Sequence, residues 1–74
     1  MNIKIRSRTA FPKILEETLY QAYREEKRSV DFLLLFPVLE EEQEQIIDQV
    51  KSHSVVLDAK WRFGTVLFTA YIKH

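Results

Sequence analysis

The sequence contains no cysteine and only one glycine, Gly64. Without cysteine the chain has no disulfide, no thiolate metal site and no cysteine nucleophile. With a single glycine it has no glycine-rich loop of the kind that holds phosphate groups. Because these absences remove several common kinds of enzyme site, we expect a protein that is not an enzyme and that binds no cofactor, no metal and no small-molecule substrate.

Neither sign of charge is in excess, since Lys plus Arg and Asp plus Glu each number 11. Only the distribution of charge can therefore indicate a partner. The apolar stretch from Val30 to Leu39 is interrupted by Asp31, and it is about half the roughly 20 residues that a membrane-spanning helix needs. The N-terminus also lacks the apolar segment of a signal peptide. We expect a soluble, cytoplasmic protein that does not contact a membrane.

What the sequence does contain is the composition of a folded domain. It has 74 residues, of which 46% are hydrophobic and 12% aromatic, and we expect residues 1–74 to form one domain. A domain of this size buries only about 60% of the surface that its unfolded chain exposes. The core is therefore small, and contact with a partner would add to it.

The spacing of apolar residues predicts strands at residues 2–8, 29–38, 54–62 and 65–74, where apolar and polar residues alternate. Spacings of three and four residues predict two helices, one from about residue 11 to residues 24–28 and one over residues 39–53. Pro12 suits the first turn of a helix, and Pro37 ends the second strand because proline cannot donate a hydrogen bond to a ladder. Gly64 indicates a tight turn between the last two strands.

The order β-α-β-α-β-β predicts an α+β fold, a two-layer sandwich in which both helices cover one face of a four-stranded mixed sheet. Alternation assigns inward and outward side chains in each strand. We expect Leu57, Trp61 and Val66 to point toward the helices, and the helices to bury Leu39 among others. The central core should contain Leu15, Leu19, Phe32, Leu34, Ile47, Val50 and Phe68.

The other sheet face is the candidate site. It would carry an apolar group framed by basic side chains that include Lys4 and Arg8, with Asp31 and Asp58 as its acidic residues. An apolar surface on an otherwise solvated sheet face is typical of an interface. The residues predicted to bind a partner are Leu33, Leu35, Val56, Leu67, Tyr71, Arg6, Lys60, Arg62 and Lys73.

This pattern predicts a small interaction module that self-associates, for example as a homodimer, or binds a protein partner through the helix-free face. An alternative is a nucleic-acid-binding domain, in which the basic residues neutralise phosphates and Tyr71 stacks on a base. A further alternative is that a third structural layer covers the face.

The element order and the dipeptide Phe11-Pro12 resemble the small bacterial sulfur-carrier proteins, whose first helix opens with Cys-Pro. The cysteine that performs their chemistry is absent here, so the resemblance implies the fold and not the activity. The order of elements is also similar to that of nucleic-acid-binding domains of the Alba and initiation-factor C-terminal type, without a diagnostic motif of either.

Two further groups of residues have chemistry of their own. Glu41, Glu44 and Asp48 share one helical face and could hold a hard cation, although a solvated acidic face is the common meaning of such a pattern. His53 lies near Ser54 in the sequence, but nothing in the pattern fixes the geometry that a hydrolytic relay requires.

Overall fold

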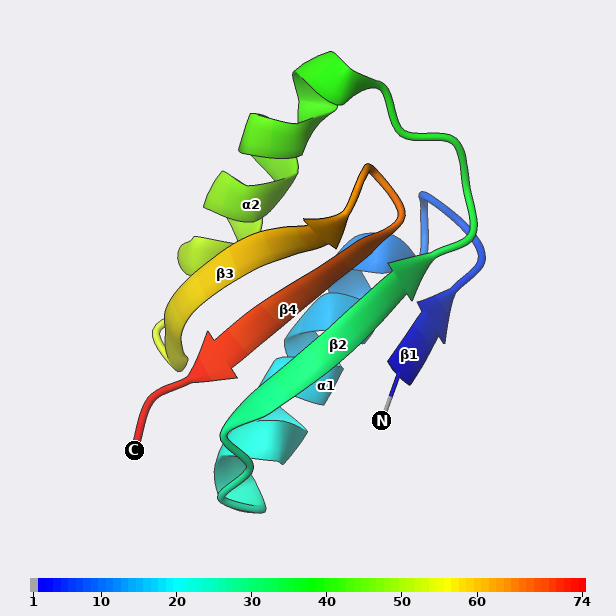
Figure 1. The fold of residues 1–74 in the computed structure, drawn as a ribbon. Helices are drawn as coiled ribbons and strands as arrows, with labels where there is room; N and C mark the ends of the chain where they lie inside the picture. Colours follow the sequence, from blue (N-terminus) through cyan, green and yellow to red (C-terminus); the bar gives the residue numbers. More distant parts are fainter. Residues whose placement is uncertain (1) are drawn as a thin grey trace.

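The computed structural model describes residues 2–74 and contains one sheet and two helices (Figure 1). The strands are β1 (Asn2–Ile5), β2 (Ser29–Leu34), β3 (Val56–Phe63) and β4 (Leu67–Ile72). The helices are α1 (Phe11–Arg24) and α2 (Gln43–Lys51), and a short 3-10 turn, η1 (Glu40–Glu42), precedes α2. Pro12 lies in the first turn of α1, as predicted.

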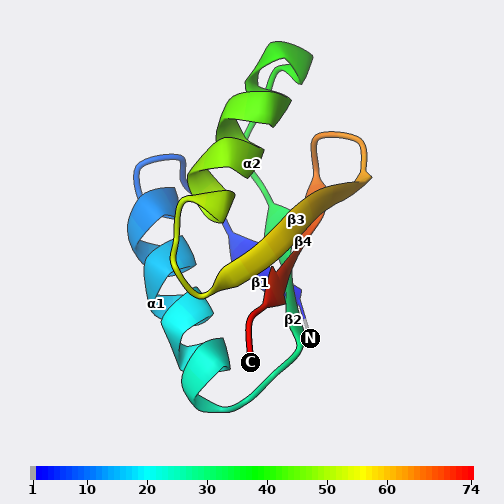
Figure 2. The ribbon, with the colours of Figure 1, turned by 90° about the vertical axis from the view of Figure 1, so that its left-hand side faces the viewer.

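The strand order in the sheet is β1-β2-β4-β3. β1 runs parallel to β2, and β4 is antiparallel to both β2 and β3. Figure 2 shows both helices on one side of the sheet and no helix on the other. The predicted fold, a mixed four-stranded sheet with two helices in the order β-α-β-α-β-β, is therefore confirmed.

The core lies between the sheet and the helices, and Phe68 of β4 is at its centre. The ring of Phe68 stacks on Phe32 with centroids 5.1 Å apart and meets the edges of Phe11 and Trp61. Phe32 and Phe68 are fully buried. The predicted core is confirmed, with Ile47 half-buried at its margin; the other predicted members are Leu15, Leu19, Leu34 and Val50.

Several side chains lie elsewhere than predicted. Leu39 is 60% exposed because the chain forms η1 before α2 begins, which takes Leu39 out of the helical stripe. Leu57 is 68% exposed and Val66 is 38% exposed, so neither belongs to the core. Arg8 lies beyond β1 and forms a salt bridge with Glu42, which removes it from the helix-free face.

Within residues 2–74, neither helix has the length and apolar composition that crossing a membrane would require.

Candidate functional site

The helix-free face of the sheet, called the open face below, is built on the central strands β2 and β4. Cross-strand pairing brings Asp31 beside Thr69 and Leu33 beside Leu67. Thr69 donates a hydrogen bond of 2.5 Å from Oγ1 to Asp31 Oδ1. A shallow depression of about 300 Å³ lies over this pair, and it is lined by Ser29, Asp31, Arg62, Leu67, Thr69 and Tyr71.

One end of the open face is apolar. Leu67 of β4 is paired with Leu33 on one side and with Phe63 on the other. Leu35 follows Leu33 by two residues, and its amide is bonded to the Ile5 carbonyl, so the chain is still extended there. Phe63 is 71% exposed and Leu35 is 43% exposed. We call Leu33, Leu35, Phe63 and Leu67 the apolar patch.

Helix α2 holds the turn that carries Phe63. The Trp61 indole donates a hydrogen bond to the Gln43 carbonyl at 3.1 Å, and the Gln43 side chain donates to the Gly64 carbonyl at 2.8 Å. Gly64 has φ +53°, a conformation that glycine adopts without steric cost. Both contacts with Gln43 are made by residues close to Phe63 in the chain, so Phe63 is presented on a supported backbone.

The strand pattern did not predict Phe63 as a residue of the open face, because Phe63 was assigned to the connection between two strands. The available signal was its place beside Gly64, at a hairpin end where few core positions exist. A β-bulge puts Arg62 and Phe63 together opposite Leu67.

The prediction that Val56 belongs to the open face is wrong. Val56 is 4% exposed and belongs to the core cluster. A second bulge between Val56 and Asp58 shifts the register, so Val56 pairs with the buried Ile72 and Asp58 pairs with Tyr71. Leu57 takes the exposed position instead, and it lines a depression together with Tyr71.

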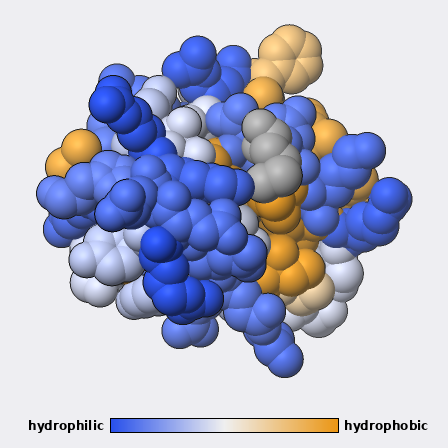
Figure 3. All heavy atoms as spheres, turned by 90° about the horizontal axis from the view of Figure 1, so that it is seen from below, coloured by the Kyte–Doolittle hydropathy of each residue, from blue (hydrophilic) through white to orange (hydrophobic). Residues whose placement is uncertain are grey.

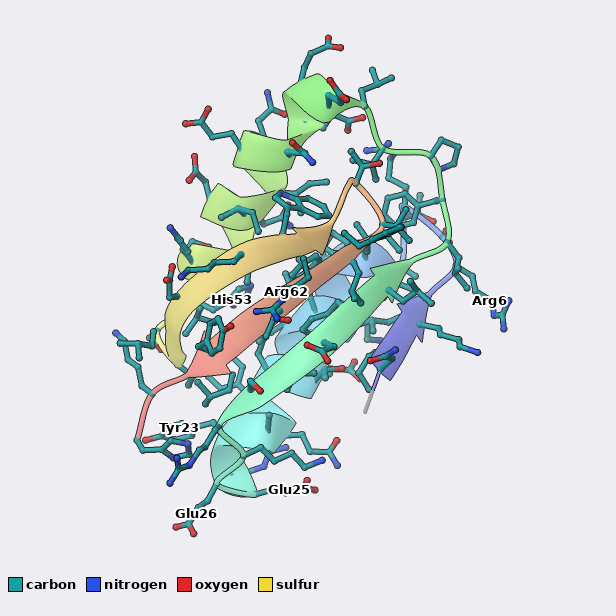
Figure 4. All side chains as sticks on the ribbon, in the orientation of Figure 1. Arg6, Tyr23, Glu25, Glu26, His53 and Arg62 are labelled. Atoms are coloured by element: carbon teal, nitrogen blue, oxygen red, sulfur yellow. The ribbon has the colours of Figure 1, made fainter. Side chains whose placement is uncertain are left out.

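Basic side chains stand around the open face. Lys4 pairs in register with Leu33, and Lys60 pairs with Thr69. Figure 4 shows Arg62 projecting over β4, where its guanidinium donates to the Tyr71 hydroxyl at 3.2 Å. Within residues 2–74, none of these three side chains is part of a salt bridge.

The other two predicted basic residues are less central. Arg6 follows the end of β1, and its side chain points away from the molecule beyond the outer edge of that strand (Figure 4). Lys73 follows the end of β4 and is exposed, and its amide bonds to the Val55 carbonyl. The structure therefore brings Lys60 and Arg62 together with the apolar residues and leaves Arg6 and Lys73 at the periphery.

Acidic side chains are concentrated away from the open face. All of them except Asp31 and Asp58 lie in or immediately after the helical segments α1, η1 and α2. Asp58 accepts a hydrogen bond from the Ala59 amide at 2.8 Å and lies 3.4 Å from Lys51 Nζ. These groups lower the pKa of Asp58, with the Ala59 amide having the larger effect. Asp58 is thus in a salt bridge with Lys51 of α2, and the charge of Lys60 on the open face also lowers its pKa.

The end of the molecule at which α1 finishes has a different surface. Seen from that end in Figure 3, hydrophilic side chains cover most of the surface, and apolar side chains form an area on the right of the view. Three residues labelled in Figure 4, Tyr23, Glu25 and Glu26, lie at this end. The apolar patch belongs to the opposite end, beside the β3–β4 turn.

The remaining candidates do not form a site. No three acidic or histidine side chains of residues 2–74 come close enough to hold a metal ion, and this includes Glu41, Glu44 and Asp48. His53 meets the ring of Tyr20 edge to face, with centroids 6.3 Å apart. The Ser54 hydroxyl is hydrogen-bonded to the Tyr20 hydroxyl at 3.3 Å rather than to His53.

The fold and the site together define a small α+β sandwich with one open, basic and partly apolar sheet face. No protein-family model, curated protein or solved structure matches this chain.

Proposed function

We propose that this chain is a non-enzymatic interaction module that binds a protein, either a second copy or a different partner, through the open face. The observation that carries the proposal is the apolar patch on a sheet face that no helix covers. Solvent-exposed apolar residues that adjoin one another mark interaction sites more often than isolated ones do.

The composition of the patch suits protein binding. Phe63 offers a large apolar side chain on a supported turn, and aromatic anchors surrounded by smaller apolar contacts carry most of the free energy at protein interfaces. Leu33 and Leu67 are half-buried and directly paired, so they form an ordered apolar surface beside Phe63. Basic side chains at the margin are typical of the polar rim of an interface.

The open face also supports a second candidate, the binding of single-stranded nucleic acid. Lys4, Lys60 and Arg62 form no salt bridge within the described residues, and Tyr71 lines the central depression. Basic side chains combined with an exposed ring are the usual elements of such surfaces. Tyr71 pairs with Ser29 and Asp58, apart from the apolar patch, and three of the four residues of that patch are leucines, which favours a protein.

The proposal is tested with two matched variants on a solid support. The double variant Leu33→Lys/Leu35→Glu places charge in the apolar patch, and the control Leu39→Lys places charge on an exposed leucine of the helix layer. Wild type and control should retain the same protein from a cell extract, and the double variant should lose it, because burying a charge carries a large desolvation cost.

The retained protein is then purified and its binding to each immobilised chain is measured directly. If the retained protein is the chain itself, light scattering at two concentrations should show a dimer for wild type and a monomer for the double variant. Equal binding by the double variant and wild type would refute the proposal, provided that both melt cooperatively.

A further inference from the structure

The charges of this molecule are separated between its two layers although its formal net charge is zero. The helical layer carries the acidic residues, and those on the outside of η1 and α2, such as Glu41, Glu44 and Asp48, are exposed. The open face carries exposed Lys4, Lys60 and Arg62. Asp58 pairs with Lys51, whereas Asp31 accepts only the neutral Thr69 hydroxyl, which does not cancel the charge of a carboxylate. Outside the salt bridges of residues 2–74, the open face therefore carries three basic side chains and one acidic side chain, and its balance of charge is positive.

This charge distribution bears on what can cover the open face. In a symmetric dimer built on this face, each copy would present the same surface to the other. Lys4, Lys60 and Arg62 of both copies would be brought together around the apolar patches, and each open face would supply only one carboxylate outside a salt bridge, Asp31, against these three basic side chains. Juxtaposed like charges suppress association, whereas opposite charges favour it.

A partner with carboxylates at the rim of its binding surface would replace this repulsion between like charges with attraction. Its acidic side chains would meet Lys60 and Arg62 while its apolar centre covered Phe63 and Leu67. Arginine suits this role because its planar fork binds a carboxylate with two hydrogen bonds. The Tyr71 hydroxyl already holds the Arg62 guanidinium over β4 at 3.2 Å, which reduces the entropy that binding would cost.

We propose that the open face binds a protein surface that is acidic at its rim and apolar at its centre, and that it rejects a second copy of itself. This inference rests on the proposed function and narrows it to one class of partner.

The test uses the chain itself as the source of a matched acidic surface. The triple variant Lys4→Glu/Lys60→Glu/Arg62→Glu keeps the apolar patch and replaces its basic frame with carboxylates. A control variant makes the same change of charge in and just after α1, away from the open face; its substitutions are Lys13→Glu, Arg24→Glu and Lys27→Glu. Sedimentation or light scattering then measures wild type alone, each variant alone and each variant mixed equally with wild type.

Wild type alone should be monomeric, and its mixture with the triple variant should form a one-to-one heterodimer. Raising the salt from about 0.1 M to about 1 M shortens the Debye length from about 10 Å to about 3 Å and should weaken the heterodimer at least tenfold. The substitution Phe63→Ser in wild type should also weaken it at least tenfold, because it removes the exposed aromatic anchor. The control mixture should remain monomeric.

Two outcomes of the association measurements would overturn the inference, and so would one outcome of an oligonucleotide-binding measurement. One is a wild-type dimer that Leu33→Lys/Leu35→Glu converts to monomer, which would leave the proposed function standing with a second copy as partner. The other is a mixture of wild type and triple variant that stays monomeric. In the oligonucleotide measurement, the contradicting outcome is that wild type binds a single-stranded oligonucleotide, with binding lost in the triple variant and unaffected by Phe63→Ser. That result would identify the partner as nucleic acid rather than an acidic protein, and it would refute the proposed function as well.

Discussion

At the scale of single residues, the stability of the fold depends most on the aromatic centre of the core. Phe32 is fully buried and stacks on Phe68 with an interplanar angle of 19°. Replacing Phe32 by Ala leaves a cavity between the sheet and α1, and such substitutions cost about 3 to 5 kcal/mol. Since small domains have only about 5 to 15 kcal/mol of total stability, the Phe32→Ala variant should be largely unfolded or melt far below wild type. Circular dichroism melting checks this, and a near-native transition would contradict the core assignment.

Arg8 and Glu42 form the second contact that matters at this scale. Arg8 donates to Glu42 Oε2 at 2.6 Å and to the Pro37 carbonyl at 2.6 Å, and its guanidinium lies 5.2 Å from the Phe36 ring centroid. Arg8 thereby links the chain after β1 to the segment between β2 and α2. The hydrogen bond from Arg8, followed by that from the Leu39 amide, lowers the pKa of Glu42 below its usual value of 4.5.

A carboxylate with a lowered pKa stabilises the folded state at pH values above its unfolded pKa, and this contribution is lost as pH falls through the folded pKa. The variant Glu42→Gln should therefore be less stable than wild type at neutral pH, and the difference should shrink as the pH is lowered from about 5 to about 3. Glu41→Gln is the control, because Glu41 is exposed and forms no salt bridge within residues 2–74. Urea unfolding over this pH range is the measurement, and a difference that persists in acid would contradict the role of the ion pair.

At the scale of elements, the end of α1 contains a conformation that its residue does not favour. Glu26 has φ +60°, in the left-handed region. It follows the C-cap Glu25, and the Lys27 amide bonds back to the Ala22 carbonyl while the Glu26 amide bonds to Tyr23. This is the hydrogen-bond pattern of a Schellman motif, in which glycine normally takes the left-handed position.

The substitution Glu26→Gly should therefore raise the free energy of unfolding by about 1 kcal/mol, because it relieves the left-handed strain of a side-chain-bearing residue. Glu25→Gly is the matched control and should be neutral or destabilising, since Glu25 has φ −86°. Denaturant unfolding of both variants measures the difference. If Glu26→Gly were no more stable than Glu25→Gly, the assignment of strain to Glu26 would be wrong.

The element scale also shows how far the sequence predicts the structure. Alternation predicted the faces of β1, β2 and β4 correctly where their backbones are regular, and it placed Leu33 and Leu67 on one face, although all three strands are shorter than predicted. It failed at the start of β3, where a bulge shifts the register so that Val56 is buried and Leu57 is exposed. The faces of Ala59, Lys60, Trp61 and Arg62 were predicted correctly, and the second bulge affects Phe63. A bulge changes the face of a side chain without changing the residue type, so the pattern of Val55 to Arg62 could not reveal it.

The candidate site was predictable to a similar extent. Its centre, its tyrosine and the pair Lys60 and Arg62 followed from the strand pattern, but Phe63 did not. The turn that carries Phe63 is held by α2 through Gln43 and Trp61, and contacts between elements that far apart in the chain are not visible in the sequence, where the place of Phe63 beside Gly64 was the one local signal.

At the scale of the whole molecule, a neutral chain separates its charges into an acidic helix layer and a basic sheet face, with an apolar patch at one end of that face. Leucine side chains lie in each of these regions and can therefore serve as probes of them. Leu33, Leu35 and Leu67 lie on the open face, Leu39 is exposed on the helix layer, and Leu15, Leu19 and Leu34 are in the core.

The most direct measurement is a methyl NMR spectrum of leucine-labelled protein, recorded while the protein recovered on immobilised wild type is added. We predict that the methyl signals of Leu33, Leu35 and Leu67 shift or broaden as the complex forms, and that those of Leu39 stay in place. Changes at Leu39 with the three open-face leucines unaffected would contradict the claim that this face binds the partner.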